Sequence, residues 1–294
     1  MSKKNNRTNS GLPGLVDVRT TRTAAGQACG VSIFTTHAAL TFQLPAFATL
    51  FESPWQVMDT LESKIGALKH IVATQFVNTT DMDEGTRLTI MVAVASKKPD
   101  DMMTAAALVA GDVTDILTES GLEPELWSKA TFLTAIGQLD SSHSLTCDTS
   151  RLVREGTDGQ EATVSFEINQ SWDIDVECWD NLIVEVGEDV FCEVARLYRP
   201  FAHDKATGRV AGVLTVWGSS VAEAETVADA VIAAAPTPVR LHIRRMFDRQ
   251  VAGFITTQSV GGFGWEIPLD HLCPGVEMVK SIPATQNEFQ EVNV

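Results

Sequence analysis

Apolar residues in the first half of the chain follow first the period of a strand and then the period of a helix. Residues 31–36 and 38–45 are rich in β-branched and aromatic side chains, which favours two strands. Ser53, Pro54 and Gln56 then occupy the N-cap, first-turn and capping-box positions of a predicted helix. Its apolar residues recur every three or four positions along one face, at Val57, Leu61, Ile65, Leu68 and Val72.

A strand, a helix and a further strand complete the predicted first module. Residues 87–94 alternate between polar and apolar side chains, which is the period of a half-buried strand. Pro99 ends this strand, and a second helix is expected to run to about Ser120. The strand-like run at residues 130–137 follows, so residues 28–139 have the predicted order β-β-α-β-α-β.

The middle of the chain separates this module from a second one. Residues 140–160 lose the apolar periodicity and are rich in Ser, Thr, Asp and Gly, which predicts a linker. The second module, residues 161–262, begins with alternation at residues 162–168 and continues in strand-like runs as far as Tyr198. These runs leave little room for helices, so we expect an antiparallel meander.

A strand–helix–strand unit closes the second module. A strand at residues 210–218 leads to a helix with a capping box that begins at Ser220, and the Pro-Thr-Pro sequence at 236–238 precedes a strand at 239–246. The predicted fold class is therefore α+β, with two modules of mainly antiparallel sheet and strand–helix–strand units packed on one face. Residues 263–294 are expected to form a C-terminal extension.

Composition agrees with a folded protein, and charge separates the N-terminus from the rest. The 294 residues are 44% hydrophobic and 20% charged, and the net charge of −16 disfavours attraction of the whole protein to nucleic acid or anionic lipid. Residues 1–27 are basic instead and predict a flexible arm, which is either a solubilising tail or a contact for an acidic partner or nucleic acid. Its basic residues are Lys3, Lys4, Arg7, Arg19 and Arg22.

The cysteine pattern and the apolar runs bear on the compartment. The five cysteines are odd in number and contain no CxxC pair, as expected for reduced thiols in the cytoplasm. The polar N-terminus predicts no secretory signal, and the apolar runs are shorter than the roughly 20 residues that a membrane-spanning helix needs. We therefore expect a cytoplasmic protein with no membrane span, on its own or within a particle or a membrane-associated complex.

Sequence motifs for catalysis and cofactor binding are absent. The chain contains no Gly-Lys dipeptide, which excludes a P-loop, and no GxGxxG, HExxH or GxSxG motif. The six histidines are dispersed along the chain. The sequence therefore predicts no cofactor and no catalytic residue.

Two sets of residues have side chains that can bind metal ions, but their spacing along the chain is only a weak signal for a metal site. Asp173, Asp175 and Glu177 alternate with apolar residues, so on a strand they share one face that could hold a hard cation such as Mg²⁺; a solvated polar face has the same pattern. Zinc accepts the side chains of a second set, but no short paired spacing recurs there, so we predict no metal. This second set is His143, Cys147, His271 and Cys273.

A basic stripe is the candidate contact site of the sequence. Arg240, His242 and Arg244 lie on one face of the predicted strand, and Arg245 and Arg249 follow directly. Such a stripe can bind phosphate, nucleic acid or an acidic protein surface. The alternative is cross-strand pairing with acidic residues of the same sheet, including the three named above.

One family resemblance covers most of residues 28–262. The segment 208–262 is similar to the strand–helix–strand that ends the N-terminal, non-motor region of the motor ATPases of conjugative transfer and type IV secretion. Gln250 and Phe254 stand where a Gln and a Phe follow the last strand of that region. The helix that begins SPWQ, the strand TRLTIMVAVAS and the later ELW sequence resemble its first half in order.

The resemblance implies a docking or assembly module that associates through β edges. The ATP-binding motor of that family would follow, yet no Walker motif is present, so no hydrolytic activity is implied. Together with the patterned core, this leads us to expect a non-enzymatic structural or assembly protein that self-associates or docks in a larger complex. The alternatives are a phage or virus particle protein with a basic arm, and a metal-dependent enzyme that uses the acidic strand face.

Overall fold

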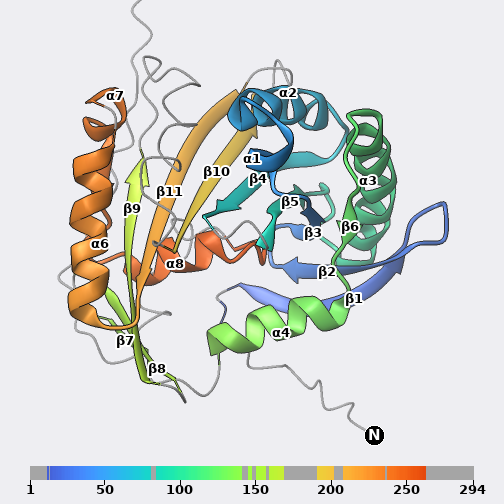
Figure 1. Cartoon of the computed structure of the whole chain (residues 1–294). Helices are drawn as coiled ribbons and strands as arrows, with labels where there is room; N and C mark the ends of the chain where they lie inside the picture. Colours follow the sequence, from blue (N-terminus) through green and yellow to red (C-terminus); the bar gives the residue numbers. More distant parts are fainter. Residues whose placement is uncertain are drawn as a thin grey trace, which may run out of the picture.

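The fold is seen in a computed structural model, drawn in Figure 1, that describes most of the chain. The described residues are 12, 14–80, 84–140, 145–147, 150–156, 159–168, 191–201, 208–235 and 237–262. Within them, every strand pairing is antiparallel and all strands belong to one sheet. The α+β class predicted from the sequence is confirmed.

The sheet has 12 strands within the described residues, in the order β1-β2-β3-β5-β4-β10-β11-β9-β8-β7, with β6 beside β3 and β12 beside β9. The strands are β1 (Leu15–Arg22), β2 (Ala28–Phe34), β3 (Ala38–Leu44), β4 (Ile71–Thr79), β5 (Thr86–Val92), β6 (Glu125–Leu126), β7 (Leu145–Cys147), β8 (Leu152–Gly156), β9 (Gly159–Ile168), β10 (Cys192–Pro200), β11 (Gly208–Gly218) and β12 (Ile243–Arg245). The helices are α1 (Phe47–Leu50), α2 (Pro54–Gly66), α3 (Pro99–Glu119), α4 (Lys129–Asp140), α6 (Val221–Ala234), α7 (Thr237–Arg240) and α8 (Gln250–Thr257).

The two predicted modules share this one sheet. Strand β4 of the first pairs with β10 of the second over six residue pairs, from Glu193 opposite Thr79 to Tyr198 opposite Thr74. The predicted linker at 140–160 contains β7 and β8, which extend the sheet beyond β9. Strand pairing across the module boundary therefore replaces the predicted separation.

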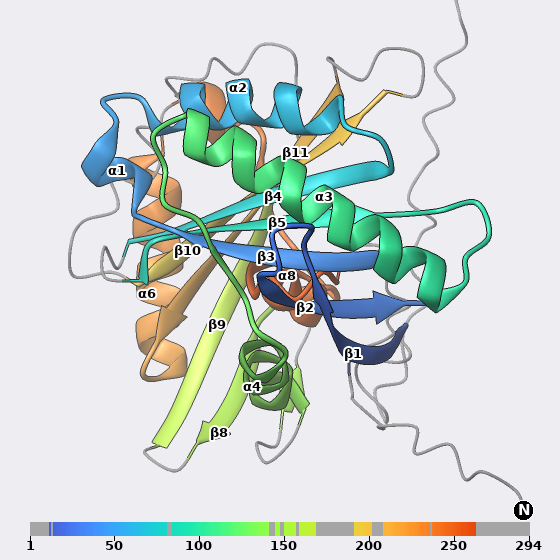
Figure 2. The ribbon, with the colours of Figure 1, turned by 90° about the vertical axis from the view of Figure 1, so that its right-hand side faces the viewer.

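One face of the sheet is apolar and packs against helices; we call it the apolar face. Its core residues include Leu40, Phe76 and Leu88 in the first half, and Val194 and Leu214 in the second. Helices α2, α3 and α6 pack on this face, with α2 and α3 above the strands in Figure 2. Alternation along each strand sends these side chains to the helices, because successive residues of a strand point to opposite faces.

The opposite face, which we call the polar face, mixes small polar and apolar side chains. Ser32, Thr41, Thr89, Thr215 and Ser165 all lie on it and are buried. Helix α4 contacts its β1–β2 end, and α8 contacts β9, β10 and β11. Figures 1 and 2 show α8 and α4 on the side of the sheet away from α2 and α3.

Two glycines allow these helices to approach the polar face closely. A Cβ atom at Gly30 would lie 2.6 Å from the backbone nitrogen of Lys129, where α4 begins. A Cβ atom at Gly253 of α8 would lie 2.4 Å from the Cβ atom of Ser165. Both positions therefore need glycine for its size.

Several predicted elements differ from the structure. Residues 130–137 form α4 and not a strand; Phe132 and Ile136, four residues apart, pack on the sheet, and the Ser128 hydroxyl accepts a hydrogen bond from the backbone N–H of Thr131 (3.1 Å). In a short apolar run, a spacing of three to four residues between the buried side chains therefore favours a helix over a strand. The first helix ends at Gly66, and a turn with φ +72° at His70 starts β4, so Val72 belongs to a strand.

Most of the predicted strand at residues 239–246 does not form a strand. Residues up to Arg240 form the short helix α7, and only Ile243–Arg245 pair with β9. The reason is local: the Arg240 guanidinium donates to the carbonyls of Ala233 (2.7 Å) and Ala235 (2.8 Å) at the end of α6, which holds the chain in a turn. This arrangement removes the predicted one-sided stripe.

Helix capping and the N-terminal arm were predicted with mixed success. The Ser220 hydroxyl accepts from the backbone N–H of Glu223 (3.2 Å), as the capping box predicts, whereas the Ser53 side chain makes no cap hydrogen bond. Residues 15–22 of the predicted flexible arm form strand β1, and residues 1–11 lie outside the described residues. No helix among the described residues is long and apolar enough to cross a membrane.

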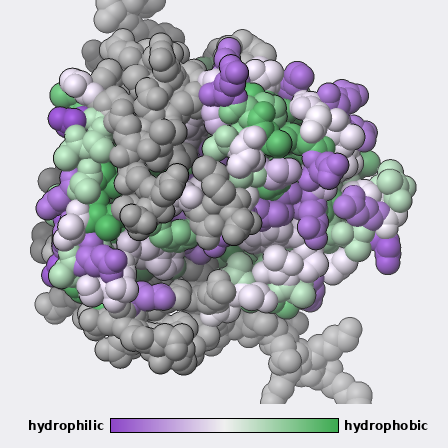
Figure 3. Space-filling model, viewed as in Figure 1, coloured by the Kyte–Doolittle hydropathy of each residue, from purple (hydrophilic) through white to green (hydrophobic). Residues whose placement is uncertain are grey.

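The surface in Figure 3 mixes polar and apolar groups, with an apolar area over α1 and α2. Leu50 of α1 is half exposed. Scattered apolar residues of this kind are ordinary on protein surfaces, so we assign them no role.

Candidate functional site

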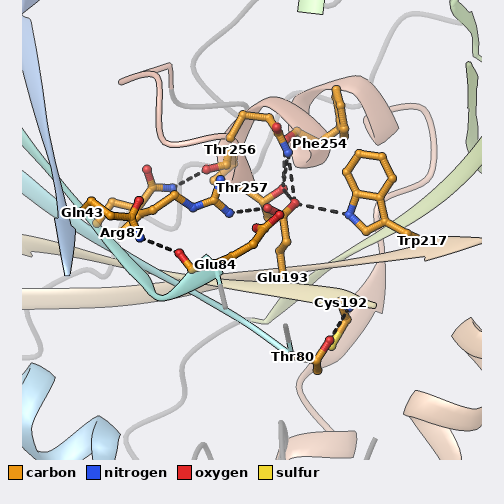
Figure 4. A network of polar contacts seen from close by, with 12 residues as sticks. Gln43, Thr80, Glu84, Arg87, Cys192, Glu193, Trp217, Phe254, Thr256 and Thr257 are labelled. Atoms are coloured by element: carbon orange, nitrogen blue, oxygen red, sulfur yellow. Dashed lines mark hydrogen bonds and ion pairs between the residues drawn. The ribbon is translucent and has the colours of Figure 1, made fainter. Parts of the chain in front are cut away.

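The densest polar network among the described residues surrounds Glu193 on the polar face (Figure 4). Its side chain is buried, and one carboxylate oxygen, Oε1, forms an ion pair with Arg87. The other oxygen, Oε2, accepts from Trp217 Nε1 (3.3 Å), Thr257 Oγ1 (2.9 Å) and Gln258 Nε2 (3.0 Å). Four donors from strands and from the α8 end therefore compensate this buried carboxylate, which burial alone would penalise.

The polar face also binds the main chain that follows α8. Gln75 Nε2 donates to the carbonyl of Thr256 (2.5 Å). The hydroxyls of Thr41 (2.8 Å) and Thr89 (3.1 Å) both donate to the carbonyl of Ser259. Three strands, β3, β4 and β5, thus supply donors to two carbonyls of this segment.

Two further carbonyls are bound beside strand β2. The Ser32 hydroxyl donates to the carbonyl of Val260 (3.0 Å), and His37 Nε2 lies 2.8 Å from the carbonyl oxygen of Gly261. A carbonyl oxygen only accepts, so His37 carries a proton on Nε2, while its Nδ1 atom forms a hydrogen bond with the Thr36 hydroxyl (3.0 Å). The side chain donors of the sheet therefore follow residues 256–261, which we call the strap.

Gln250 positions the start of α8 on the same face. Its Oε1 atom accepts from the backbone N–H of Ser165 (2.7 Å), and its Nε2 atom donates to the carbonyls of Ser165 (3.2 Å) and Met246 (3.0 Å). Phe254, one turn further, packs edge-on against Trp217 with ring centroids 5.3 Å apart. Both residues that carry the family resemblance are therefore buried anchors of α8.

Three buried atoms of this region have no hydrogen-bond partner among the described residues. They are Gln75 Oε1, Arg87 Nε and Ser259 Oγ. Register places their residues close together, because Gln75 lies opposite Thr89 and Thr89 binds the strap at Ser259. An unpartnered buried polar atom is costly, so the strap does not saturate the hydrogen-bonding capacity of this face.

A second buried polar group lies on the apolar face, under α2. Arg196 Nε donates to Glu62 Oε2 (2.9 Å), and its terminal nitrogen donates to Asp59 Oδ1 (2.7 Å). The Arg196 guanidinium also lies 6.0 Å from the centroid of the Trp55 ring. Burial raises the pKa of Glu62 to about 7, although the charge and hydrogen bond of Arg196 act in the opposite direction.

The predicted basic stripe is divided among internal contacts. Arg240 binds the end of α6, Arg245 pairs with Glu225 (2.7 Å), and Arg249 pairs with Glu167 (3.3 Å). Arg244 is exposed and His242 is partly buried. The structure therefore does not unite the five residues in one basic surface. Two of them form ion pairs with acidic residues, but each pair joins a strand to a helix or helix end and not two strands, so the predicted cross-strand pairing is not what neutralises them.

The other predicted site residues are largely not described. Arg19 pairs with Asp17 (2.8 Å) and Asp100 (3.0 Å), and Arg22 donates to the carbonyl of Gly26 (2.8 Å). The remaining predicted arm and metal-type residues lie outside the described residues or have undescribed side chains: Lys3, Lys4, Arg7, His143, Cys147, Asp173, Asp175, Glu177, His271 and Cys273. Within the described part of the chain, no three ligand-type side chains form a group that could hold a metal ion.

The two cysteines with described side chains are buried thiols. Burial raises the pKa of Cys192 to about 12 and raises that of Cys29 as well. The thiolate is the reactive form of cysteine, so neither residue is an activated nucleophile.

Sequence reasoning did not find Glu193, Arg87 or the polar donors around them. A signal was present, since Arg87 and Thr89 interrupt the apolar residues of β5 on alternate positions, and Glu193 does the same in β10. Alternation in β5 predicts a half-buried strand, with its polar side chains in solvent, whereas α8 and the strap cover this face of the sheet.

Comparisons with known proteins return little. No protein-family model matches the chain, and no curated protein matches it. Among solved structures, a crystal structure of 6-hydroxy-D-nicotine oxidase from Arthrobacter nicotinovorans is similar at 12% identity with a TM-score of 0.31, over 87% of this chain and 64% of the oxidase chain. A likeness of this size carries no argument for oxidase activity here.

From the sequence we expected a non-enzymatic structural or assembly protein, in a secretion apparatus or in a virus particle. The comparisons give that expectation no support, since the solved structure named above is an oxidase. We therefore withdraw the assembly role.

Proposed function

We propose that the polar face of the sheet is a binding site for a polypeptide segment, and that the strap occupies this site within the same chain. The observation behind the proposal is that five side chains from β2, β3, β4, β5 and the β2–β3 turn donate to four main-chain carbonyls of the strap. The proposed activity is binding and needs no catalytic group.

Recognition of main-chain carbonyls is suited to a polypeptide ligand. Every residue offers a carbonyl acceptor, so donors aimed at carbonyls accept segments of different sequence. The side chains of the strap are recognised at fewer positions than its carbonyl groups. Glu193 accepts from Thr257 and Gln258, and Val260 is fully buried against the sheet.

The unpartnered buried atoms support an exchangeable occupant. A permanent core segment is expected to satisfy buried polar groups almost completely. Gln75 Oε1 and Arg87 Nε lack partners among the described residues, although both lie beside the strap. A different segment could therefore make more hydrogen bonds here than the strap does.

The test loosens the strap in the full chain and offers the same sequence as a separate peptide. Gly261 has φ +87°, and a Cβ atom there would lie 2.3 Å from Ala39 Cβ, so Gly261→Val should release the strap end. A fluorescent peptide of residues 254–262 should then bind this variant saturably, and Thr41→Val with Thr89→Val should weaken that binding by about tenfold. Val260→Asp serves as a second strap-releasing variant if Gly261→Val does not fold.

The matched control is Thr74→Val. Thr74 is as buried as Thr41 and Thr89, but it lies on the apolar face and its hydroxyl has no partner among the described residues. Peptide binding should be unchanged by this substitution. Absence of saturable binding to a folded strap-released variant, or an equal loss with Thr74→Val, would show that the strap is ordinary core.

We also infer a reducing compartment for the protein. Cys29 and Cys192 are buried free thiols, which fits the cytoplasm expected from the cysteine pattern. Mass spectrometry of the protein isolated under alkylating conditions should find both thiols reduced.

A further inference from the structure

The buried group under α2 contains two carboxylates and one guanidinium. The Glu62 side chain is fully buried, that of Arg196 is 3% exposed, and that of Asp59 is 60% exposed. One terminal nitrogen of Arg196 lies 2.7 Å from Asp59 Oδ1 and 2.8 Å from Glu62 Oε2. The two acidic residues therefore share the same donor.

Glu62 is only half satisfied by this arrangement. Its Oε2 atom takes both contacts from Arg196, and its Oε1 atom is buried with no partner among the described residues. With both carboxylates ionised, one guanidinium faces two negative charges, one on the partly exposed Asp59 and one on the fully buried Glu62. A buried uncompensated charge is costly, and taking up a proton removes it.

Among the described residues, the elements that pack on α2 supply no further buried charge to offset it, and the buried residues of α3 are all apolar. The β4 residues that share the apolar face beside Arg196 are uncharged, namely Thr74, Phe76 and Asn78. On β10, the titratable neighbours on this face are Cys192 and Tyr198, which are neutral near pH 7, Cys192 because burial raises its pKa to about 12. Arg196 and Asp59 are the charged groups that act on Glu62.

We propose that Glu62 is a proton-binding site, and that its proton controls how firmly α2 is held on β10. In the protonated state, Arg196 is balanced by Asp59, and Glu62 Oε2 still accepts from Arg196. In the ionised state, α2 places a second negative charge against the sheet, on the fully buried Glu62, and Arg196 has to balance both carboxylates. Raising the pH through neutrality therefore loosens α2, and lowering it tightens α2.

The direction agrees with the shifted pKa of Glu62. The folded-state value of about 7 lies above the ordinary value of 4.5, so the folded protein binds the proton more tightly than the unfolded chain. The stabilisation from this group is complete below about pH 4.5 and is lost as the pH rises toward 7.

The direct test is a titration of the full chain, followed by the carbon-13 chemical shift of the Glu62 Cδ atom. We expect a midpoint near neutral pH that Asp59→Asn moves to a lower value, because removal of a neighbouring negative charge favours ionisation. A midpoint in the ordinary carboxyl range would overturn the proposal, whatever the behaviour of any variant.

The conformational half of the proposal is tested by hydrogen exchange of α2 amides between pH 5.5 and 8.5, corrected for the intrinsic exchange rate. Protection should fall with rising pH in the wild-type chain and should become independent of pH in Glu62→Gln, which keeps the shape and removes the titration. The exposed Glu119 gives the control Glu119→Gln, which should behave as wild type. Persistence of the pH dependence in folded Glu62→Gln would refute the link to α2.

Discussion

The two faces of the sheet bury polar groups in different ways. The apolar face holds one tight cluster, in which Arg196 is the donor that Glu62 and Asp59 share. The polar face spreads its groups over seven strands and covers them with α8 and the strap, so that Glu193 alone has four donors. The contrast shows that the cluster on the apolar face depends on Arg196, whereas Glu193 on the polar face keeps three donors when one is removed.

The largest expected effect comes from the same substitution, Arg→Met, made once on each face of the sheet. Arg196→Met removes both hydrogen bonds to Glu62 and leaves that carboxylate buried without a charge partner, so we expect a loss of about 3–5 kcal/mol in the free energy of unfolding. Arg87→Met leaves Glu193 with three donors, and we expect about 1–2 kcal/mol. Urea denaturation at pH 7.5 measures both. Equal losses would remove the contrast between a concentrated and a distributed network.

The next prediction concerns how closely α8 approaches the polar face. Gly253→Ala places a methyl group 2.4 Å from Ser165 Cβ and should cost about 1–3 kcal/mol. The control is Gly111→Ala in α3, where a Cβ atom meets nothing within 4 Å; it should raise stability by up to about 1 kcal/mol because alanine favours helix. Thermal unfolding of the two variants should move in opposite directions. A harmless Gly253→Ala would show that α8 is not packed tightly on the sheet.

A smaller effect is expected when a single hydrogen-bond donor to Glu193 is removed. Trp217→Phe removes the Nε1 donor to Glu193 but keeps an aromatic ring beside Phe254, so we expect a loss of about 1 kcal/mol in unfolding free energy. If the two donors act independently, the loss should be the same in an Arg87→Met background, and a double-mutant cycle should then give a coupling energy of zero. A measured coupling above about 0.5 kcal/mol would instead show a cooperative network.

The smallest effect concerns the basic residues at the sheet edge. Arg245→Ala removes contacts to Glu225 and to the carbonyl of Ser150 and should cost up to about 1 kcal/mol, since the pair is partly exposed. Arg244→Ala should leave the unfolding midpoint unchanged, because Arg244 is exposed. Chemical denaturation distinguishes them. An equal loss in both variants would mean that Arg244 has a structural role as well.

Local patterns were sufficient for the elements that local physics controls. Helix α3 follows the strand that Pro99 was predicted to end, and it stops at Glu119, one residue before the predicted end at Ser120. The Ser220 cap forms because its signal lies within one turn. Residues 130–137 and 239–246 were misread because short apolar runs fit both periods, and their packing on the sheet or against α6 selected the outcome.

Of the candidate sites, the sequence pointed to the basic residues near the C-terminal strand but not to the polar face or to Glu62. Glu62 lies on the inward side of α2 among apolar residues, so its position alone marked it as unusual. Its partner was out of reach of sequence reasoning, because Arg196 is separated from Glu62 by 134 positions.

By itself, the sequence determined the α+β class, the three long helices α2, α3 and α6, and the alternation that gives each strand two faces. The tertiary structure decided that both predicted modules share one sheet and that the polar face is buried. The reason is that β4 and β10 meet only through long-range pairing. That pairing brings Arg87 within reach of Glu193, although 106 positions separate them along the chain, and no local pattern encodes it.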